Sequence, residues 1–121
     1  MSPHLQVWRF HVTMLVSILH RGAGIILYAS LIALAAMLTA IAMGPAAYDA
    51  LIGWAPFWLI QTKILAFTAA LAFHFGNGIR HLFWDAGTGF QPATANLTAW
   101  LVILFTFAAP AALFIYINFV R

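Results

Sequence analysis

Long apolar stretches alternate with short polar ones along this chain. The apolar stretches are three, at residues 22–43, 57–79 and 97–120. Each is close to or above the roughly 20 residues that a helix needs to cross the hydrocarbon core of a bilayer. Because no water is available there, the backbone must satisfy its own hydrogen bonds, as a helix does. The pattern therefore predicts an all-α membrane protein with three transmembrane helices joined by short loops.

The apolar pattern also indicates where these helices begin and end. Residues before Gly22 are themselves mostly apolar, so the first helix is expected to start earlier, and we place the helices at about residues 12–43, 57–81 and 97–120. The first helix would then be about 48 Å long at roughly 1.5 Å per residue, and would tilt or project beyond the bilayer. We treat residues 1–121 as a single membrane domain.

The connections between the predicted helices have a different composition. Residues 44–56 and 84–96 contain glycine, proline and polar side chains, which favour turns.

Composition supports the membrane assignment and excludes several function classes. The chain is 65% hydrophobic and 6% charged, whereas a soluble domain is about 45–50% apolar and about 25% charged. Its five Lys and Arg residues form no basic run, so no nucleic-acid partner is expected. The absence of cysteine excludes disulfides, iron–sulfur clusters and c-type haem attachment on this chain. Any redox centre that it holds must therefore be bound through histidine.

The basic residues near the helix ends predict the orientation of the chain. Arg9, Arg21 and Arg80 fall on one side of the membrane, whereas Arg121 and Lys63 fall on the other. Because basic residues are enriched in cytoplasmic segments, this distribution favours a cytoplasmic N-terminus.

Polar residues interrupt the second predicted helix near its end. His74, Asn77, Gly78 and His81 have the spacing i, i+3, i+4, i+7, so they share one helix face. Gly76 and Gly78 remove side chains from the helix surface, which permits the close approach of another helix or of a flat ligand. Ionisable residues inside a membrane are costly, and they are candidates for a functional site.

A second polar cluster opens the first helix. Ser17, His20, Arg21 and Gly24 have the same spacing of i, i+3, i+4, i+7. Since the first two helices run antiparallel, both clusters should lie at the same membrane face. We expect one polar site near the inner interface, built from both helices.

These residue types can bind two kinds of ligand. A neutral histidine such as His74 can ligate haem iron, and the cationic side chain of Arg21, with His20 or His81, can pair with haem propionates. The hydroxyl of Ser17 and the guanidinium of Arg21 can hydrogen-bond the carbonyl groups of a quinone.

Structural interpretations remain open for the same residues. His74 can simply hydrogen-bond a neighbouring helix, and Asn77 can link helices in the same way. Arg21 and Arg80 can be anchors that extend to the membrane surface. Asp85 can be a local charge partner of His81 or Arg80.

Helix geometry restricts how a haem could be held. His74 and His81 lie about 10 Å apart along one helix, so they cannot bind opposite faces of the same haem. His20 is expected to lie nearer the interface than His74, which makes it a poor second ligand. A second histidine ligand should therefore come from another chain.

Three ordered segments resemble the cytochrome b large membrane-anchor subunit of succinate dehydrogenase (complex II, succinate:quinone oxidoreductase). They are SPHL at residues 2–5, SILHRGAG at residues 17–24 and HFGNGIRHLFWDAG at residues 74–87. The corresponding family patterns are S-P-H-L-x-x-Y, S-x-x-H-R-x-T-G and H-x-x-x-G-x-R-H-x-x-x-D. The chain departs from them at Trp8 and at Ala23, where the patterns have tyrosine and threonine.

The resemblance implies a role for each matching residue. His74 matches the axial ligand of haem b, and Ser17 and Arg21 match residues that line the ubiquinone pocket. His20, Arg21 and His81 match positions near the haem propionates. Asp85 matches the aspartate of the third pattern. No residue of this chain is expected to oxidise succinate.

The resemblance also implies partners. A small membrane-anchor subunit would supply the second haem histidine, while a flavoprotein subunit and an iron–sulfur subunit would oxidise succinate. The expected function is electron transfer from succinate oxidation to ubiquinone, within the respiratory chain and the tricarboxylic acid cycle.

Alternatives to this function remain at the level of sequence. One is the anchor subunit of a related quinol:fumarate reductase, and another is a small non-redox proton channel with His74 as the relay. We expect a multi-pass location in a bacterial inner membrane rather than in a mitochondrial one, because no transit peptide precedes the first motif.

Overall fold

The protein is built from helices arranged around one crossing point. The computed structural model describes residues 9–53 and 55–120, so the SPHL segment, Trp8 and Arg121 lie outside the described residues. The helices are α1 (Val12–Met43), α2 (Pro45–Ile52), α3 (Phe57–Asp85) and α4 (Pro92–Ile115), which continues into a π-helical segment, η1 (Tyr116–Val120). Within the described ranges, three helices are long and apolar enough to cross a membrane, which confirms the predicted all-α fold class.

The observed helices differ from the predicted ones at several ends. The connection at residues 44–56 was expected to form turns, but eight of its residues form α2. Pro45 stands at the first helical position, where its fixed φ is favourable, and alanine and leucine follow it. Proline has the same place in α4, which begins at Pro92 rather than near residue 97. Helix α3 continues to Asp85, one turn beyond its expected end.

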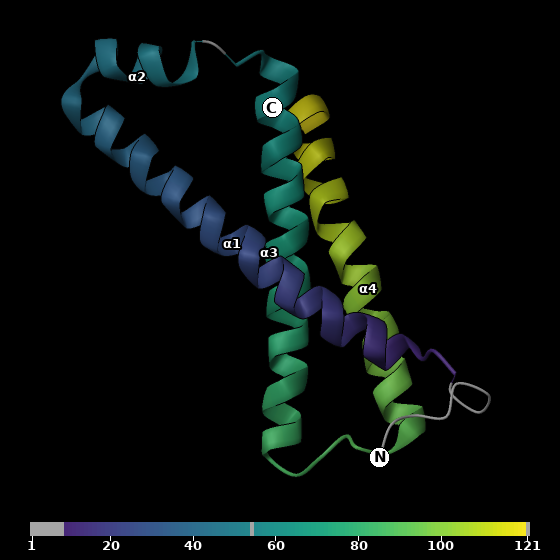
Figure 1. Ribbon diagram of the computed structural model, residues 1–121. Coiled ribbons are helices and arrows are strands. Elements are labelled where there is room, and N and C mark those ends of the chain that lie inside the picture. The colour runs from purple at the N-terminus through teal and green to yellow at the C-terminus, as the bar shows by residue number, and fades with distance from the viewer. Residues whose placement is uncertain (1–8, 54, 121) are drawn as a thin grey trace.

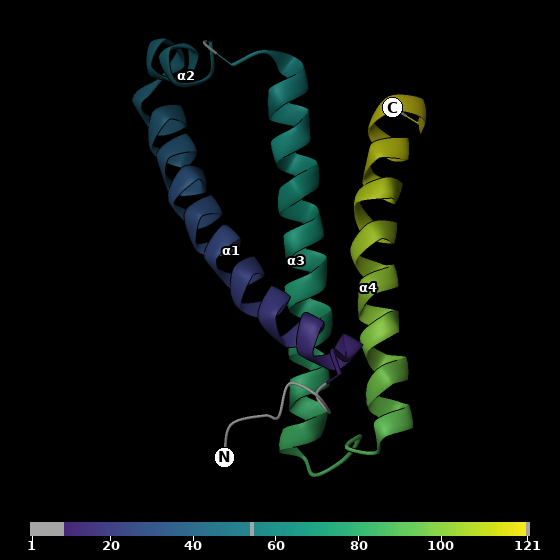
Figure 2. The ribbon, with the colours of Figure 1, turned by 45° about the vertical axis from the view of Figure 1, so that its right-hand side comes forward.

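The three long helices meet near one end of the molecule and separate toward the other. Helix α1 crosses α3 through its N-terminal half and then diverges from it, and α2 bridges the widening distance back to the start of α3 (Figure 1). Helix α4 runs alongside α3 (Figure 2). The start of α1, the end of α3 and the start of α4 therefore share one end of the molecule, which we call the closed end.

Small side chains let the helices pack closely where they meet. The buried core consists of Val16 and Ala23 from α1, Ala70 and Phe73 from α3, and Ala99 and Val102 from α4. A Cβ atom on Gly76 would lie 3.5 Å from a methyl group of Val102, so the absence of a side chain there sets the distance between α3 and α4.

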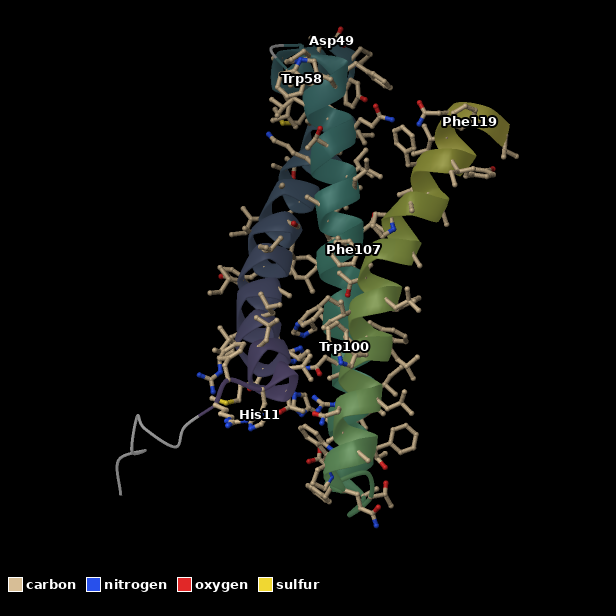
Figure 3. All side chains as sticks on the ribbon, turned by 90° about the vertical axis from the view of Figure 1, so that its right-hand side faces the viewer. His11, Asp49, Trp58, Trp100, Phe107 and Phe119 are labelled. Atoms are coloured by element: carbon tan, nitrogen blue, oxygen red, sulfur yellow. The ribbon has the colours of Figure 1, made fainter. Side chains whose placement is uncertain are left out.

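Large apolar side chains cover the outside of the molecule. Trp58, Trp100, Phe107 and Phe119 project from the helices, and each is at least 61% exposed (Figure 3). A water-soluble protein would not leave so many large apolar groups unburied. This surface is suited to contact with lipid.

Candidate functional site

Three histidines from two helices lie together near the closed end. The rings of His20 in α1 and His74 in α3 are stacked, with their centroids 4.0 Å apart and an interplanar angle of 13°. The ring of His81, two turns further along α3, meets the His20 ring edge-on at 5.2 Å. The predicted convergence of the two polar clusters into one site is therefore confirmed.

The expected depth of His20 was wrong. We expected this ring to lie nearer the membrane surface than His74, yet the two rings are in contact. The prediction assumed that both helices cross the membrane at similar angles. Because α1 is strongly inclined to α3 (Figure 1), the distance of a residue from its own helix end does not convert directly into depth.

The stacked histidines carry ring nitrogens that lack partners. Among the residues that the structure describes, only two side-chain polar atoms are both buried and without a hydrogen bond: Nδ1 of His20 and Nδ1 of His74. Buried polar groups in proteins are nearly always paired, and each exception calls for an explanation, such as strain, a redox or catalytic role, or a bound water or ion. Each ring therefore keeps a lone pair or an N–H group that the helix bundle does not use.

A glycine makes room for the ring of His74. A Cβ atom on Gly24 of α1 would lie 3.4 Å from Cε1 of His74, whereas one on Gly22 would meet nothing within 4 Å. Gly24 is thus the position at which α1 leaves space for this ring. Gly76 and Gly78 were expected to permit the close approach of another helix or of a flat ligand. Gly76 does lie close to another helix, α4, whereas a Cβ atom on Gly78 would meet nothing within 4 Å.

Arg80 lies in the interior, between α3 and α4. It is only 5% exposed, so the interpretation of this residue as an anchor that reaches the membrane surface is wrong. Its Nε donates to the hydroxyl of Thr98 at 3.0 Å, and one terminal nitrogen donates to the carbonyl of Ala95 at 3.1 Å. The other terminal nitrogen donates to Oδ1 of Asn77 at 3.3 Å. Arg80 therefore connects the end of α3 to the first turns of α4.

Asn77 joins this arginine to the histidine cluster. Its side chain is completely buried, and its amide nitrogen lies 3.2 Å from Nε2 of His81. Asn77 was considered as a link between helices, but both of its side-chain bonds are to residues of its own helix. Through these two contacts, Asn77 couples the position of the Arg80 side chain to that of His81.

Trp84 completes the polar region, and it was not among the predicted site residues. The guanidinium carbon of Arg80 lies 4.0 Å above the centroid of its ring, and His81 meets the same ring edge-on at 5.2 Å. The signal was its spacing, because Trp84 follows Arg80 by four residues and His81 by three, which places all of them on adjacent positions of one helix surface.

The two residues assigned to quinone binding lie one turn apart on α1. Ser17 lines a shallow pocket of about 380 Å³ together with Thr13, Met14, Ile18 and Trp84. Arg21 is exposed beside it and does not line this pocket. Asp85 is exposed at the end of α3, and Arg80 bonds to uncharged groups instead of to this carboxylate.

The donor set limits the kind of metal that this site can hold. Within residues 9–53 and 55–120, no group of three or more histidine, cysteine or acidic side chains is placed to hold a bare metal ion. A haem, by contrast, supplies four nitrogen ligands itself and needs only axial ligands from the protein.

Comparison with known proteins identifies the family. The family model described as "Succinate dehydrogenase/Fumarate reductase transmembrane subunit" matches residues 1–113. The succinate dehydrogenase cytochrome b556 subunit of Rickettsia felis is 36% identical over 104 residues, which are 85% of this chain and 80% of that protein. The mitochondrial succinate dehydrogenase cytochrome b560 subunit of Bos taurus is 32% identical over 120 residues, covering 88% and 64% of the two chains. The chain therefore belongs to the succinate dehydrogenase and fumarate reductase transmembrane subunits, as a cytochrome b anchor subunit of complex II.

Proposed function

We propose that this subunit binds haem b through His74 and forms part of the site at which electrons from succinate oxidation reduce ubiquinone. The observation that carries the proposal is the buried Nδ1 of His74, which has no hydrogen-bond partner at the point where α1 crosses α3. A histidine that served only to link helices would use its nitrogens for that purpose.

The residues around His74 fit a haem. The ring has an unused nitrogen, and Gly24 allows the ring to pack against α1. The surrounding helices are apolar, as a macrocycle requires, and the names of the relatives describe them as cytochrome b subunits. When bound, the haem would take up and release single electrons beside the quinone site. His74 is the residue of this chain that would hold its iron.

The second axial ligand would come from another chain. The rings of His20 and His74 lie face to face, with their centroids 4.0 Å apart. His20 is therefore unsuited to ligate the same iron in this arrangement. The small membrane-anchor subunit is the partner that we propose to supply the missing histidine.

Basic and polar side chains near the closed end would bind the carboxylates of the haem. Arg21 is exposed there, and His20 and His81 lie in contact with each other. Charge-assisted hydrogen bonds from arginine to carboxylate are roughly twice as strong as neutral ones. These three residues would fix the orientation of the ring without contacting its iron.

Ser17 and Arg21 would bind the quinone. The Ser17 pocket opens between α1 and Trp84 and has mainly apolar walls, which suits a quinone ring. The guanidinium of Arg21 would polarise one carbonyl oxygen, because a cation stabilises the negative charge that develops on it during reduction. Ser17 would donate or relay a proton to the same group.

The chemistry of succinate oxidation would remain with the soluble partners. This chain contains no cysteine with which to hold an iron–sulfur cluster. We propose that it anchors an iron–sulfur subunit and a flavoprotein subunit to the membrane, and that it accepts electrons from them. The Rickettsia relatives favour a bacterial inner membrane, and their names favour succinate oxidation over fumarate reduction.

The haem assignment is tested by optical spectroscopy on the purified complex. The reduced-minus-oxidised spectrum should show b-type absorbance, and His74→Ala should abolish it. His11→Ala is the matched control, since His11 is an exposed histidine at the start of α1. A complex without b-type absorbance, or a His74→Ala variant that keeps it, would refute the assignment and favour a non-redox role.

The quinone assignment is tested by comparing two electron acceptors. Ser17→Ala and Arg21→Leu should reduce quinone turnover by about tenfold or more, because each removes a hydrogen bond to the reacting carbonyl. Succinate oxidation with a water-soluble dye as acceptor should be unchanged, since it occurs in the soluble subunits. Full quinone turnover in both variants would contradict the proposed pocket.

A further inference from the structure

The side-chain bonds around Asn77 define the direction of a short hydrogen-bond chain. A guanidinium group can only donate hydrogen bonds. The Asn77 atom that lies 3.3 Å from Arg80 must therefore be the amide oxygen. The opposite orientation would place two N–H groups face to face inside the protein, where an unpaired donor is destabilising.

The rigidity of Arg80 keeps the amide in this orientation. Three contacts hold Arg80 independently of Asn77. Its guanidinium donates to the hydroxyl of Thr98 and to the carbonyl of Ala95, and it lies over the ring of Trp84. Asn77 itself has no exposed surface. Because the Asn77 amide is shielded from water and its oxygen accepts from Arg80, the oxygen stays on Arg80 and the NH₂ group stays on His81.

The NH₂ group then determines where His81 carries its proton. It lies 3.2 Å from Nε2 of the imidazole and can only donate. Nε2 must therefore accept, which leaves the proton of the neutral ring on Nδ1.

We infer that Asn77 and Arg80 are positioning residues that hold His81 as its Nδ1–H tautomer and thereby present one hydrogen-bond donor to the ligand of the site. The tautomer follows from the contacts within this chain alone. Its use rests on the proposed function, in which His81 lies beside a haem carboxylate. The Nδ1–H group of His81 would then be available to donate a hydrogen bond to that carboxylate.

Asn77 is the side chain that joins Arg80 to His81. Its amide oxygen accepts from Arg80, and its amide nitrogen lies 3.2 Å from Nε2 of His81. Asn77 is thus the residue by which this chain couples the two. A leucine of similar size would fill the same volume but leave Arg80 and His81 unconnected.

The tautomer can be read directly by solid-state NMR. The complex, with its histidines ¹⁵N-labelled, is reconstituted in lipid and kept reduced so that bound haem is diamagnetic. The signals of His81 are assigned as those lost in His81→Gln. Protonated and unprotonated ring nitrogens have well-separated shifts, and we expect Nδ1–H in at least about tenfold excess over Nε2–H.

Substitutions at Asn77 test the cause. Asn77→Asp replaces the donor by an acceptor and should move the proton of His81 to Nε2, whereas Asn77→Leu should give a mixture of tautomers. Asn96→Asp is the control, because Asn96 is exposed on α4 and its replacement should leave the His81 signals unchanged.

Two results would overturn the inference. One is a wild-type His81 with its proton on Nε2 or with both tautomers equally populated; this holds even if the Asn77 variants fail to assemble. The other is an Asn77→Asp complex whose His81 signals match the wild type. Absence of haem from a complex with the expected tautomer would refute the proposed function but leave the positioning role intact.

Discussion

The buried arginine shows how one residue can serve both fold and site. Arg80 donates to α4 through Thr98 and Ala95, and to the site through Asn77. Its bonded partners are uncharged, and the electron-rich face of Trp84 lies against the guanidinium. A charge inside a membrane protein is tolerated when its donors are used in this way. The position of α4 and the position of His81 therefore depend on the same side chain.

Gly24 provides a prediction at the scale of single residues. Gly24→Val should weaken haem retention by roughly tenfold, since residues that support a metal ligand have effects of this size. The added methyl groups would extend beyond a Cβ atom that already lies 3.4 Å from the His74 ring. The measurement is the haem content per complex after detergent washing.

Gly22→Val is the matched control for this experiment. It has the same cost in helix propensity, but nothing lies within 4 Å of the added Cβ. Equal loss of haem in both variants would show that the effect comes from α1 as a helix and not from contact with His74.

At the scale of elements, the sequence predicts which long helices exist better than it predicts where each helix begins and ends or at what angle two helices cross. The long apolar runs predicted α1, α3 and α4 because membrane helices must cover the bilayer thickness. Helix α2 was missed because its eight residues form too short a pattern, and the glycines and prolines around it indicated a turn. The contact between His20 and His74 was missed because the inclination of α1 depends on packing with other helices, which residue spacing does not encode.

The candidate site was also predictable only in part: the residues that share a helix face were predictable, and the burial of Arg80 was not. Spacing alone placed Ser17 and His20 on one helix face and His74 and His81 on another, and antiparallel helices bring such faces together. Burial of Arg80 was not predictable, because its partner Thr98 lies on another helix, and residue spacing along α3 does not encode how α4 packs against it.

The contact between α3 and α4 provides a prediction at the scale of elements. Gly76→Leu should destabilise the subunit by about 1–3 kcal/mol, as overpacking of a close contact does. Adding Val102→Ala should restore part of that loss, because the Cβ of residue 76 would meet the methyl groups of Val102 first. The measurement is the midpoint of thermal unfolding of the complex in detergent.

Gly78→Leu serves as the control for helix packing. Nothing lies within 4 Å of a Cβ atom at this position, so the substitution should leave the unfolding midpoint close to that of the wild type. Failure of Val102→Ala to improve the Gly76→Leu variant would show that the two residues do not set the helix distance.

At the scale of the whole molecule, the two ends have different surroundings. The start of α1 and the loop between α3 and α4 lie at the closed end, and α2 lies at the opposite end (Figure 2). In Figure 3, His11 and Asp49 mark these two ends. Since both ends are separated by helices of membrane-spanning length, they should face different compartments.

The orientation of the molecule can be tested by single cysteines, because the natural chain has none. Gln91→Cys, at the start of α4, should react with a membrane-impermeant maleimide only from the cytoplasmic side. Asp49→Cys, in α2, should react only from the outside. Both side chains are exposed. The reverse pattern would place the N-terminus outside, and labelling of both from one side would contradict the membrane-spanning assignment.

The hydrogen bonds of Arg80 also have a consequence for synthesis, because the charge of this residue is fully paired only after α4 has been made and has docked. Helix α3 is made before α4, so the guanidinium enters the bilayer ahead of Thr98 and Ala95, which later receive two of its hydrogen bonds. Until α4 docks, α3 carries an incompletely paired charge, which is costly in a lipid environment. A chain that stops short of α4 would therefore keep this guanidinium incompletely paired in the membrane, and docking of α4 supplies the missing acceptors.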